Sequence, residues 1–218
     1  MSHTSRPATP SRARTRGRDA QRLSGADRKA QIVDAATALI AERGFWGTSI
    51  QDVAAACGVT VAGVLYHVGS KDGLLIEVLE HRDRLDAEAI AAELDRPVLV
   101  EPASGDVSVI ADVSLAQFCD ALVRRNARQP EIVRLYSVLE AESLEPSHPA
   151  HGYFLARQRE GLGNFAALAA DAPDPDRLAR QVLALMDGLQ VQWLRDVEHF
   201  DLVAEWIAAS AGLDGFAR

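Results

Sequence analysis

Long apolar runs and paired cysteines are missing from this sequence. No stretch of about 18 apolar residues occurs, so we expect no membrane-spanning helix. The two cysteines, Cys57 and Cys119, form neither a C-x-x-C pair nor a disulfide framework, and a reducing cytoplasm is the simplest compartment for them. Residues 1–22 hold no apolar segment of the kind that a secretory signal needs. The 48% hydrophobic content of the 218 residues is still enough for one or two compact domains.

The motifs of common catalytic and phosphate-binding sites are also missing. The chain has no G-x-x-x-x-G-K-[ST] loop, no nucleophile elbow and no H-E-x-x-H helix, so we expect neither an enzyme nor a cofactor. A metal site at His148 and His151, with Glu145 nearby, is one interpretation of their spacing. Pro149 instead marks a helix start between the two histidines, so their rings are expected to diverge and no metal is predicted.

Charge is distributed unevenly along a chain whose total is -8. Residues 1–22 carry a net charge of +5, residues 27–72 carry -1 and residues 73–218 carry -12. The acidic part is not expected to lie on DNA phosphates, whereas the basic arm can do so. Such arms enter an A·T-rich minor groove or follow the phosphates, and a solvated tail without a fixed role is the alternative. The arginines that alternate along the arm are Arg12, Arg14, Arg16 and Arg18.

Hydrophobic spacing predicts an all-α fold of about nine helices and no alternating strand pattern. Polar caps followed by an acid or a proline begin these helices, and glycines end the early ones. The predicted organisation is a flexible arm over 1–23, a head over 24–72, a connecting helix over 71–94 and a second domain over 73–218. Helices are expected over 25–43, from Thr48 or Ser49 to Cys57, over 60–67 and 71–94, from Val107, Pro130 and Pro149, from Asp174 to Val197, and from Asp201 to Leu213.

Two short helices joined by a glycine turn, after a longer first helix, predict a helix-turn-helix. Ala54 is small where the second helix must let the third approach, and Gly58 can supply the positive φ of the turn. Thr60 can cap the third helix, whose first residues would then meet the base edges. An ordinary helical hairpin is the alternative interpretation of this spacing.

The residues around the turn resemble the TetR (tetracycline-repressor-like) family of DNA-binding regulators. The resemblance lies in residues 44–54 (GFWGTSIQDVA), 56–60 (ACGVT) and 67–75 (HVGSKDGLL), within a match over about residues 27–82. It implies a three-helix N-terminal head that binds operator DNA and a C-terminal helical bundle for effector binding and dimerisation. Only two of the 23 bases are lysines and alanine is abundant, which resembles the codon bias of a GC-rich bacterial genome.

Three positions depart from the pattern of that family. Ala62 stands where glycine is usual, Leu65 where tyrosine is usual and Val68 where phenylalanine is usual. Gly63 and Tyr66 lie one place beyond the usual glycine and tyrosine. The tyrosine–phosphate contact of the family is therefore not transferred to Leu65, and Tyr66 is expected to approach DNA from a direction of its own.

The resemblance implies DNA contacts for a set of head residues. Hydroxyl and N–H groups at the start of the second helix would hold phosphate, and a small apolar surface on the third would read thymine methyls. His67 and Lys71 would contact phosphate. The alternatives are that Thr60 and Ser70 are only helix caps and that His67 packs inside. The predicted contacts are Thr48, Ser49, Thr60, Val61, Ala62, Gly63, Tyr66, His67 and Lys71.

The second domain carries the candidate effector and dimer residues. Large side chains on inward stripes are candidates for an apolar pocket, although each of them can instead simply fill the core: Phe118, Leu122, Tyr136, Tyr153, Phe154 and Met186. One or two nearby acids could select a cationic ligand, while most are expected at the surface: Asp120, Glu140, Glu142 and Asp187. The resemblance implies a homodimer through the last two helices, with Leu185, Leu189, Trp193, Leu202 and Trp206 as candidate interface residues.

These patterns predict a one-component transcriptional regulator that binds operator DNA as a homodimer and is released by a small-molecule effector. Repression is the commoner outcome in the family, so a repressor is expected. Effector binding would shift the connecting helix and change the spacing of the two heads, so DNA and effector would be coupled negatively. One alternative is a ligand-independent DNA-binding dimer that recruits a protein partner, which a cavity in the second domain would argue against. The other is a helical enzyme, which lacks a convergent catalytic set in this sequence.

Overall fold

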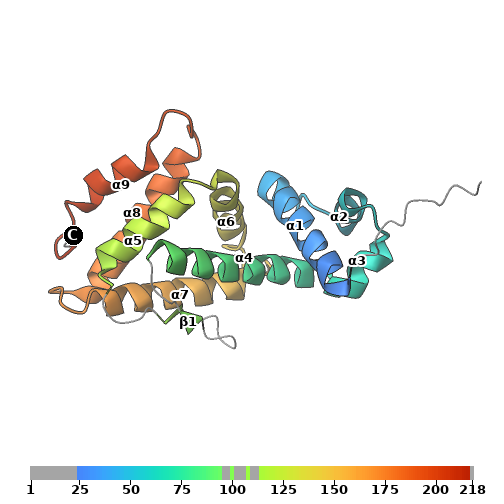
Figure 1. Ribbon diagram of the computed structural model, residues 1–218, viewed down its shortest axis with the longest axis horizontal. Helices are drawn as coiled ribbons and strands as arrows, with labels where there is room; N and C mark the ends of the chain where they lie inside the picture. The colour runs from blue at the N-terminus through green and yellow to red at the C-terminus, as the bar shows by residue number, and fades with distance from the viewer. Residues whose placement is uncertain (1–23, 95–98, 101–106, 109–112, 217–218) are drawn as a thin grey trace, which may run out of the picture.

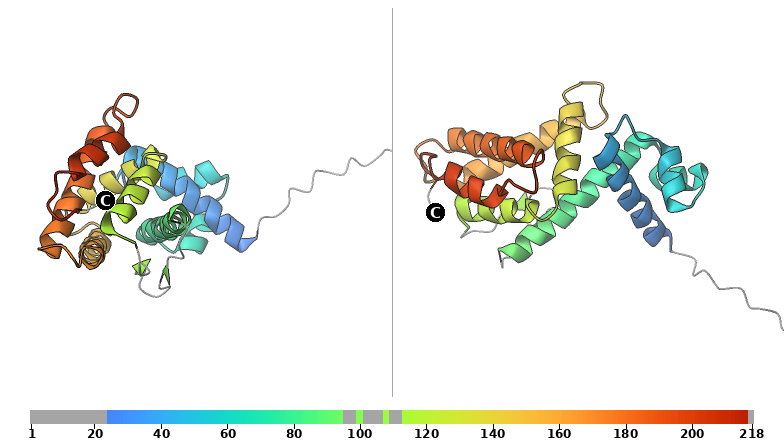
Figure 2. Two further views of the ribbon diagram at one scale, coloured as in Figure 1. Left: turned by 60° about the vertical axis from the view of Figure 1, so that its left-hand side comes forward. Right: turned by 90° about the horizontal axis from the view of Figure 1, so that it is seen from above.

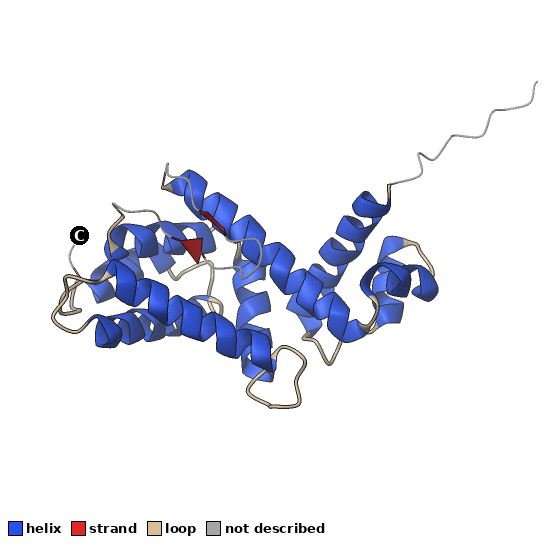
Figure 3. Cartoon of the chain, turned by 90° about the horizontal axis from the view of Figure 1, so that it is seen from below, coloured by secondary structure: helices blue, strands red, loops and turns tan. Residues whose placement is uncertain are grey.

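The computed structural model describes residues 24–94, 99–100, 107–108 and 113–216, which are almost entirely helical (Figure 3). These ranges contain nine helices: α1 (Gly25–Arg43), α2 (Ile50–Cys57), α3 (Val61–Val68), α4 (Lys71–Glu93), α5 (Leu115–Asn126), α6 (Pro130–Glu142), α7 (His151–Leu168), α8 (Pro175–Trp193) and α9 (Leu202–Ser210). Figure 1 shows an elongated molecule with α1–α3, called the head here, at one end and α5–α9, called the body, at the other. The all-α prediction is confirmed.

Polar caps begin the head helices at the residues that the sequence predicted. Ser24 and Ser49 each form a complete capping box with the acid three residues later, Asp27 and Asp52. Thr60 caps α3 by accepting a hydrogen bond from a backbone N–H in its first turn. Helices as short as α2 and α3 are marginal on their own, so the caps and their packing against α1 hold them in place.

The 23-residue α4 joins the head to the body as one continuous helix. Its first half contributes the buried Leu75 and Leu79 to the same apolar cluster as the head, while Ile90 near its end packs into a second cluster with the body. The predicted boundary at residues 72–73 therefore falls inside the packing unit of the head. Because one helix belongs to both clusters, a tilt of α4 must carry the head with it.

The head also rests on the body through α6. The first apolar cluster contains Leu135 and Leu139 of α6 and Phe154 of α7 together with buried residues of α1–α4. Figure 2 shows α6 standing beside α1 when the molecule is seen from above. The head is thus supported by two helices of different direction, α4 and α6. The second cluster lies mainly in α5, α7, α8 and α9, with Trp206 of α9 almost fully buried.

Several predicted helix limits were wrong. Val107, expected to begin a helix, lies in β2 (Val107–Ser108), which pairs antiparallel with β1 (Leu99–Val100). Strands of two residues are too short to show an alternating pattern. α5 begins only at Leu115, after a capping box at Ser114. α7 begins two residues beyond the predicted Pro149, and α8 and α9 end four and three residues before Val197 and Leu213.

No single helix in the described ranges is long and apolar enough to cross a membrane. α2 and α3 reach that length and apolarity only when taken together, and they are bent by 105° relative to each other.

Candidate nucleic-acid interface

α2 and α3 form a helix-turn-helix whose turn is set by one glycine. Gly58 adopts φ +64° and ψ +34°, and the chain bends by 105° between the two helices. Val53 and Ala54 of α2 and Val64 of α3 are buried where the helices meet α1. The predicted motif is therefore present with its small inner contact at Ala54, and one face of α3 remains free for a partner.

The exposed face of α3 carries two of the residues that were predicted to read bases. Tyr66 is 86% exposed and Ala62 is also exposed, whereas Val64 and Val68 on the opposite face are buried. Val61 and Gly63 are half-buried. Thr60 accepts a hydrogen bond from Gly63 N–H at 3.0 Å, so its cap role is real, and its own O–H remains a donor. Ala62 and Tyr66, four residues apart, thus lie on one exposed face of α3, while Val61 also packs against the first apolar cluster.

His67 and Leu65 lie beside this surface. The His67 ring is half-buried and meets the Tyr66 ring edge-to-face, with 5.2 Å between the centroids. His67 is therefore neither a core histidine nor fully exposed, and it can orient Tyr66. Leu65 is half-buried. An apolar side chain there cannot donate a hydrogen bond to a phosphate, so Leu65 cannot make the family's tyrosine–phosphate contact.

The N-terminus of α2 is occupied by the protein's own groups. Thr48 is only 4% exposed, and its hydroxyl donates to the Gly44 carbonyl at 2.9 Å. The prediction that the Thr48 hydroxyl holds phosphate was therefore wrong. Ser49 is half-buried, and its N–H and hydroxyl both donate to the Asp52 carboxylate. These hydrogen bonds lower the pKa of Asp52 and mean that a phosphate would have to compete with this carboxylate.

Lys71, the first residue of α4, lies over an aromatic pair. Its Nζ is 4.2 Å from the centroid of the Phe45 ring and 5.8 Å from that of Trp46. Rings hold an ammonium group over their faces without using its N–H donors, which stay available for a phosphate. Among the ion pairs found in the described ranges, none includes Lys71. The predicted arm contacts Arg12, Arg14, Arg16 and Arg18 lie outside the described residues.

A network around Asp83 ties α4 to α6 and α7. The Asp83 carboxylate accepts hydrogen bonds from the Tyr136 hydroxyl at 2.8 Å and from the Tyr153 hydroxyl, and it pairs with Arg157. The Arg157 guanidinium also lies 4.6 Å from the centroid of the Tyr136 ring. Burial raises the pKa of both tyrosines, so they stay protonated donors. Four side chains from three helices thus hold the middle of α4, and we call them the Asp83 network.

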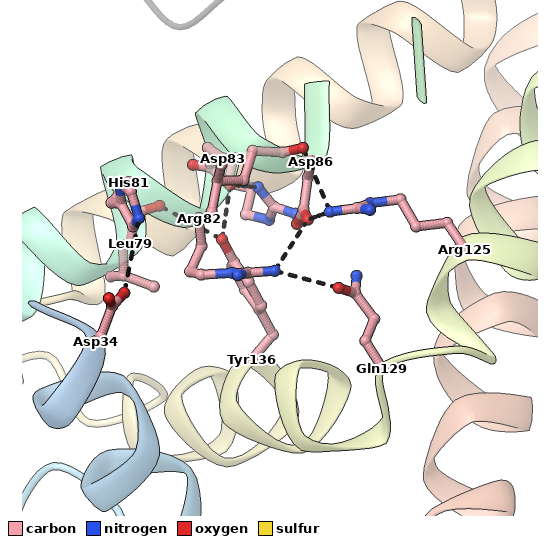
Figure 4. Close-up of polar contacts among 11 residues, drawn as sticks. Asp34, Leu79, His81, Arg82, Asp83, Asp86, Arg125, Gln129 and Tyr136 are labelled. Atoms are coloured by element: carbon pink, nitrogen blue, oxygen red, sulfur yellow. Dashed lines mark hydrogen bonds and ion pairs between the residues drawn. The ribbon is translucent and has the colours of Figure 1, made fainter. Parts of the chain in front are cut away.

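A second set of contacts lies one turn further along α4. Asp86 pairs with Arg82 on its own helix and with Arg125 of α5, and Arg82 also donates to Gln129 at 3.2 Å (Figure 4). These side chains are largely buried, and paired buried charges of this kind are costly to separate. The body therefore contacts α4 through polar side chains on two successive turns. No local pattern in the sequence predicts these long-range pairs.

Two acids lie near the Asp83 network. Burial, together with the charge of Glu140, raises the pKa of Asp187 to about 6, although Arg157 opposes the shift. Burial likewise raises the pKa of Glu140, again against Arg157. Both residues are nonetheless exposed, so solvent weakens the effect of burial on their pKa values. Arg157 thus lies among three acids from α4, α6 and α8: Asp83, Glu140 and Asp187.

The six predicted pocket residues do not share one cluster. Tyr136, Tyr153 and Phe154 pack against or within the first apolar cluster, and the two tyrosines belong to the Asp83 network. Phe118, Leu122 and Met186 belong to the second cluster, where the Phe118 ring meets Phe165 at 6.1 Å between centroids. Tyr136, Tyr153 and their polar partners are the better candidates for an effector site.

His148 and His151, whose spacing allowed a metal site as one interpretation, have separate partners. His148 is buried and its Nδ1 accepts from Ala150 N–H at 3.2 Å, while His151 Nδ1 lies 2.7 Å from the Ser143 carbonyl oxygen. In the described part of the chain, no three potential metal-binding side chains gather. Sequence reasoning missed that His148 and Glu142 face the head, because their partners are about a hundred residues away.

Most of the predicted dimer residues are not at a surface. Leu189, Trp193, Leu202 and Trp206 are buried within the protomer, so this prediction was wrong for all four, and only Leu185 is half-buried. Their apolar stripe packs against the chain's own helices. The exposed residues of α8 and α9 include charged ones such as Asp187 and Glu205 and also small or apolar ones: Ala184, Gly188, Val191, Ala204 and Ala208.

Comparison with known proteins identifies the head. Residues 32–78 match the model of the family described as bacterial regulatory proteins, tetR family. The regulator BetI of Burkholderia thailandensis is 33% identical over 156 residues, which cover 65% of this chain and 77% of that protein. The chain belongs to the TetR family. Its family and its relatives are transcriptional regulators rather than enzymes.

Another relative matches over a shorter segment of the chain. The transcriptional repressor Rv3405c of Mycobacterium tuberculosis is 44% identical over 78 residues, and the match spans 36% of this chain and only 38% of the repressor. The fold of the chain is similar to that of a regulator from Saccharomonospora viridis solved in complex with choline, with a TM-score of 0.65. The two share 22% identity, and the match covers 85% of this chain and 95% of that one. NalD, the secondary repressor of the MexAB-OprM multidrug efflux pump in Pseudomonas aeruginosa, gives a TM-score of 0.61 at 25% identity over 85% of this chain and 93% of NalD.

Proposed function

We propose that this TetR-family protein is a one-component repressor that binds operator DNA as a homodimer and is released by a small-molecule effector. The observation that carries the proposal is the exposed face of α3, held by a buried inner face against α1 and α2. Ala62 and Tyr66 offer a methyl group and a phenol to the major groove, and Lys71 offers an ammonium group to the backbone.

Dimerisation is proposed through the exposed faces of α8 and α9. Small residues there, such as Gly188 and Ala208, let two helix pairs approach closely, and Val191 supplies exposed apolar area near the C-terminal end of α8. A twofold dimer would present two heads to two half-sites of an operator. A single small reading surface gives modest specificity, so two heads at a fixed spacing are what make operator recognition selective.

The effector is proposed to bind beside the Asp83 network. Asp83, Glu140 and Asp187 carry more negative charge than Arg157 balances, and Tyr136 and Tyr153 add aromatic faces. Carboxylates and aromatic faces together favour an organic cation. The choline-bound regulator shares only the fold at its level of identity, so the acids of this chain carry the proposal. A cation drawn to Asp83 would compete with Tyr136, Tyr153 and Arg157 and loosen the hold of the body on α4.

In vitro selection from random DNA duplexes, followed by affinity measurement on the enriched sequence, tests the function. The expected result is an enriched palindromic sequence that binds in the nanomolar range typical of specific operators. Quaternary ammonium compounds should then weaken binding, while carboxylates of similar size should not. Enrichment of no sequence would reject the DNA-binding proposal. If no cationic, anionic or neutral compound weakened binding to the operator, the result would instead favour the ligand-independent dimer.

A further inference from the structure

The turn between α1 and α2 is held by a residue of the body. Phe45 N–H donates to Glu142 Oε2 at 2.8 Å, although the two residues are 97 positions apart. Gly44, which ends α1, adopts φ +72°, and a Cβ there would lie 2.3 Å from Glu142 Oε1. Glycine at this position therefore serves both the backbone conformation and the close approach of the carboxylate.

His148 of the α6–α7 loop completes the contact. Its side chain is fully buried and meets the Phe45 and Trp46 rings edge-to-face, at 5.1 Å and 5.5 Å between centroids. Its Nδ1 accepts from Ala150 N–H, so in the neutral ring the hydrogen is on Nε2, which lies 3.8 Å from Glu142 Oε2. Burial lowers the pKa of His148, and neutral imidazole is the form that fits this apolar setting.

The same aromatic pair carries Lys71, the proposed phosphate contact. Lys71 Nζ lies over Phe45 and Trp46, whose edges meet His148. Ser49, the cap of α2, follows Trp46 by three residues. A shift of the turn would therefore move the start of the helix-turn-helix and the seat of Lys71 together.

α6 carries both the proposed effector contacts and this link to the head. Tyr136, which binds Asp83, precedes Glu142 by six residues on one rigid helix, or about 9 Å of helical rise. We propose that Glu142, assisted by His148, is a positioning residue for DNA binding that latches the α1–α2 turn to α6. The head then has two connections to the body, α4 and this latch. The link to an effector rests on the proposed function, whereas the latch itself does not.

Three substitutions in the full-length chain test the latch. Glu142→Ala removes the acceptor of the Phe45 N–H, Glu142→Gln keeps an oxygen acceptor, and Glu131→Ala removes an exposed acid from the other end of α6 as the control. Amide hydrogen exchange at Phe45, melting temperature and affinity for the selected operator are measured for each. Should Glu142→Ala not fold, Glu142→Asp keeps the charge but withdraws the acceptor by one methylene group.

Glu142→Ala is expected to speed exchange at Phe45 by about tenfold or more while amides inside α1 keep their protection. Its operator affinity is expected to fall roughly two- to thirtyfold, because a head that samples several orientations is less often ready to bind. Glu142→Gln and Glu131→Ala should resemble the wild type. An increase in affinity would also support a positioning role, since the latch would then hold the head away from its DNA-bound orientation.

Two results would overturn the latch. Unchanged protection at Phe45 in Glu142→Ala would show that the hydrogen bond does not hold the turn. Lost protection with unchanged operator affinity would show that the turn does not position the head. Failure of the wild type to bind any selected duplex would reject the proposed function instead, and the exchange measurement would still decide whether the turn is latched.

Discussion

Trp206 donates its indole N–H to the Asp120 carboxylate at 2.8 Å, with its ring almost fully buried between α5 and α9. This contact explains why Trp206 belongs to the core of the protomer. A glutamate at position 206 would place a second carboxylate beside Asp120 without a partner. We therefore expect Trp206→Glu to unfold the body rather than to yield folded monomers.

Trp206→Phe is the milder test of the same contact. The ring volume is largely kept, while the Asp120 carboxylate loses one donor, so the variant should lose about 1–3 kcal/mol of unfolding free energy. Denaturant unfolding of the two proteins measures the difference. Phe165→Leu, a core change on α7 without a hydrogen bond to replace, is a control for altered packing. Wild-type stability in Trp206→Phe would show that the indole–carboxylate bond is energetically neutral.

Lys71 and Tyr66 should affect DNA binding in different ways. Lys71→Ala should weaken binding to all duplexes and reduce the slope of affinity against salt by about one unit, since one phosphate contact is lost. Tyr66→Ala should change which sequences are preferred, because this side chain projects from the reading face. Fluorescence anisotropy over a salt series separates the two effects. If Lys71→Ala left the salt slope unchanged, the cation would not contact phosphate.

Val191 should lie in the dimer interface. It is 41% exposed in the protomer, so a substitution there has little reason to disturb the fold. Val191→Glu is expected to give folded monomers, because like charges would face each other across the twofold axis. Leu155→Glu, at an exposed apolar position on α7, is the matched control. Sedimentation and circular dichroism distinguish the outcomes, and a folded dimeric Val191→Glu protein would move the interface elsewhere.

Local signals were sufficient to predict the head. Ser24 with Asp27, Ser49 with Asp52 and the turn at Gly58 all act within a few residues, and the structure has helices at those places. Helix capping and turn geometry depend on the residues immediately around them, so both can be predicted from the sequence. The assignment of Thr48 failed because a hydroxyl near a helix start serves equally to bind a backbone carbonyl one turn earlier.

The body was harder to predict because its decisive contacts are long-range. A stripe of apolar residues shows which face of α9 is buried, but not whether it packs against α5 or against a second chain. Trp206 was accordingly predicted for the interface and lies in the core. Glu142 was predicted as a pocket or surface acid, and its contact with Phe45 depends on how α6 meets the head. No spacing within α6 carries that information.

Asp187 should make stability depend on pH. The pKa of Asp187 in the folded chain is about 6, above its ordinary value of 3.8, because burial and Glu140 disfavour the charged form. A raised folded pKa means that the folded state binds the proton more tightly than the unfolded state does, so stability falls as pH rises from 3.8 through about 6. Above that range the ionised carboxylate imposes a constant penalty, which contact with solvent reduces.

Asp187→Asn removes this titration while keeping the shape of the side chain. The variant should melt at a higher temperature than the wild type at about pH 7.5, and the difference should shrink steadily towards about pH 4. Asp171→Asn, an exposed carboxylate between α7 and α8, controls for the change in net charge. Thermal unfolding, followed by circular dichroism over that pH range, gives the melting temperatures of Asp187→Asn, Asp171→Asn and the wild type. The difference in melting temperature between Asp187→Asn and the wild type could instead stay constant from about pH 4 to 7.5. Asp187 would then have the same pKa in the folded and unfolded chains, and the charge of Glu140 would not raise it.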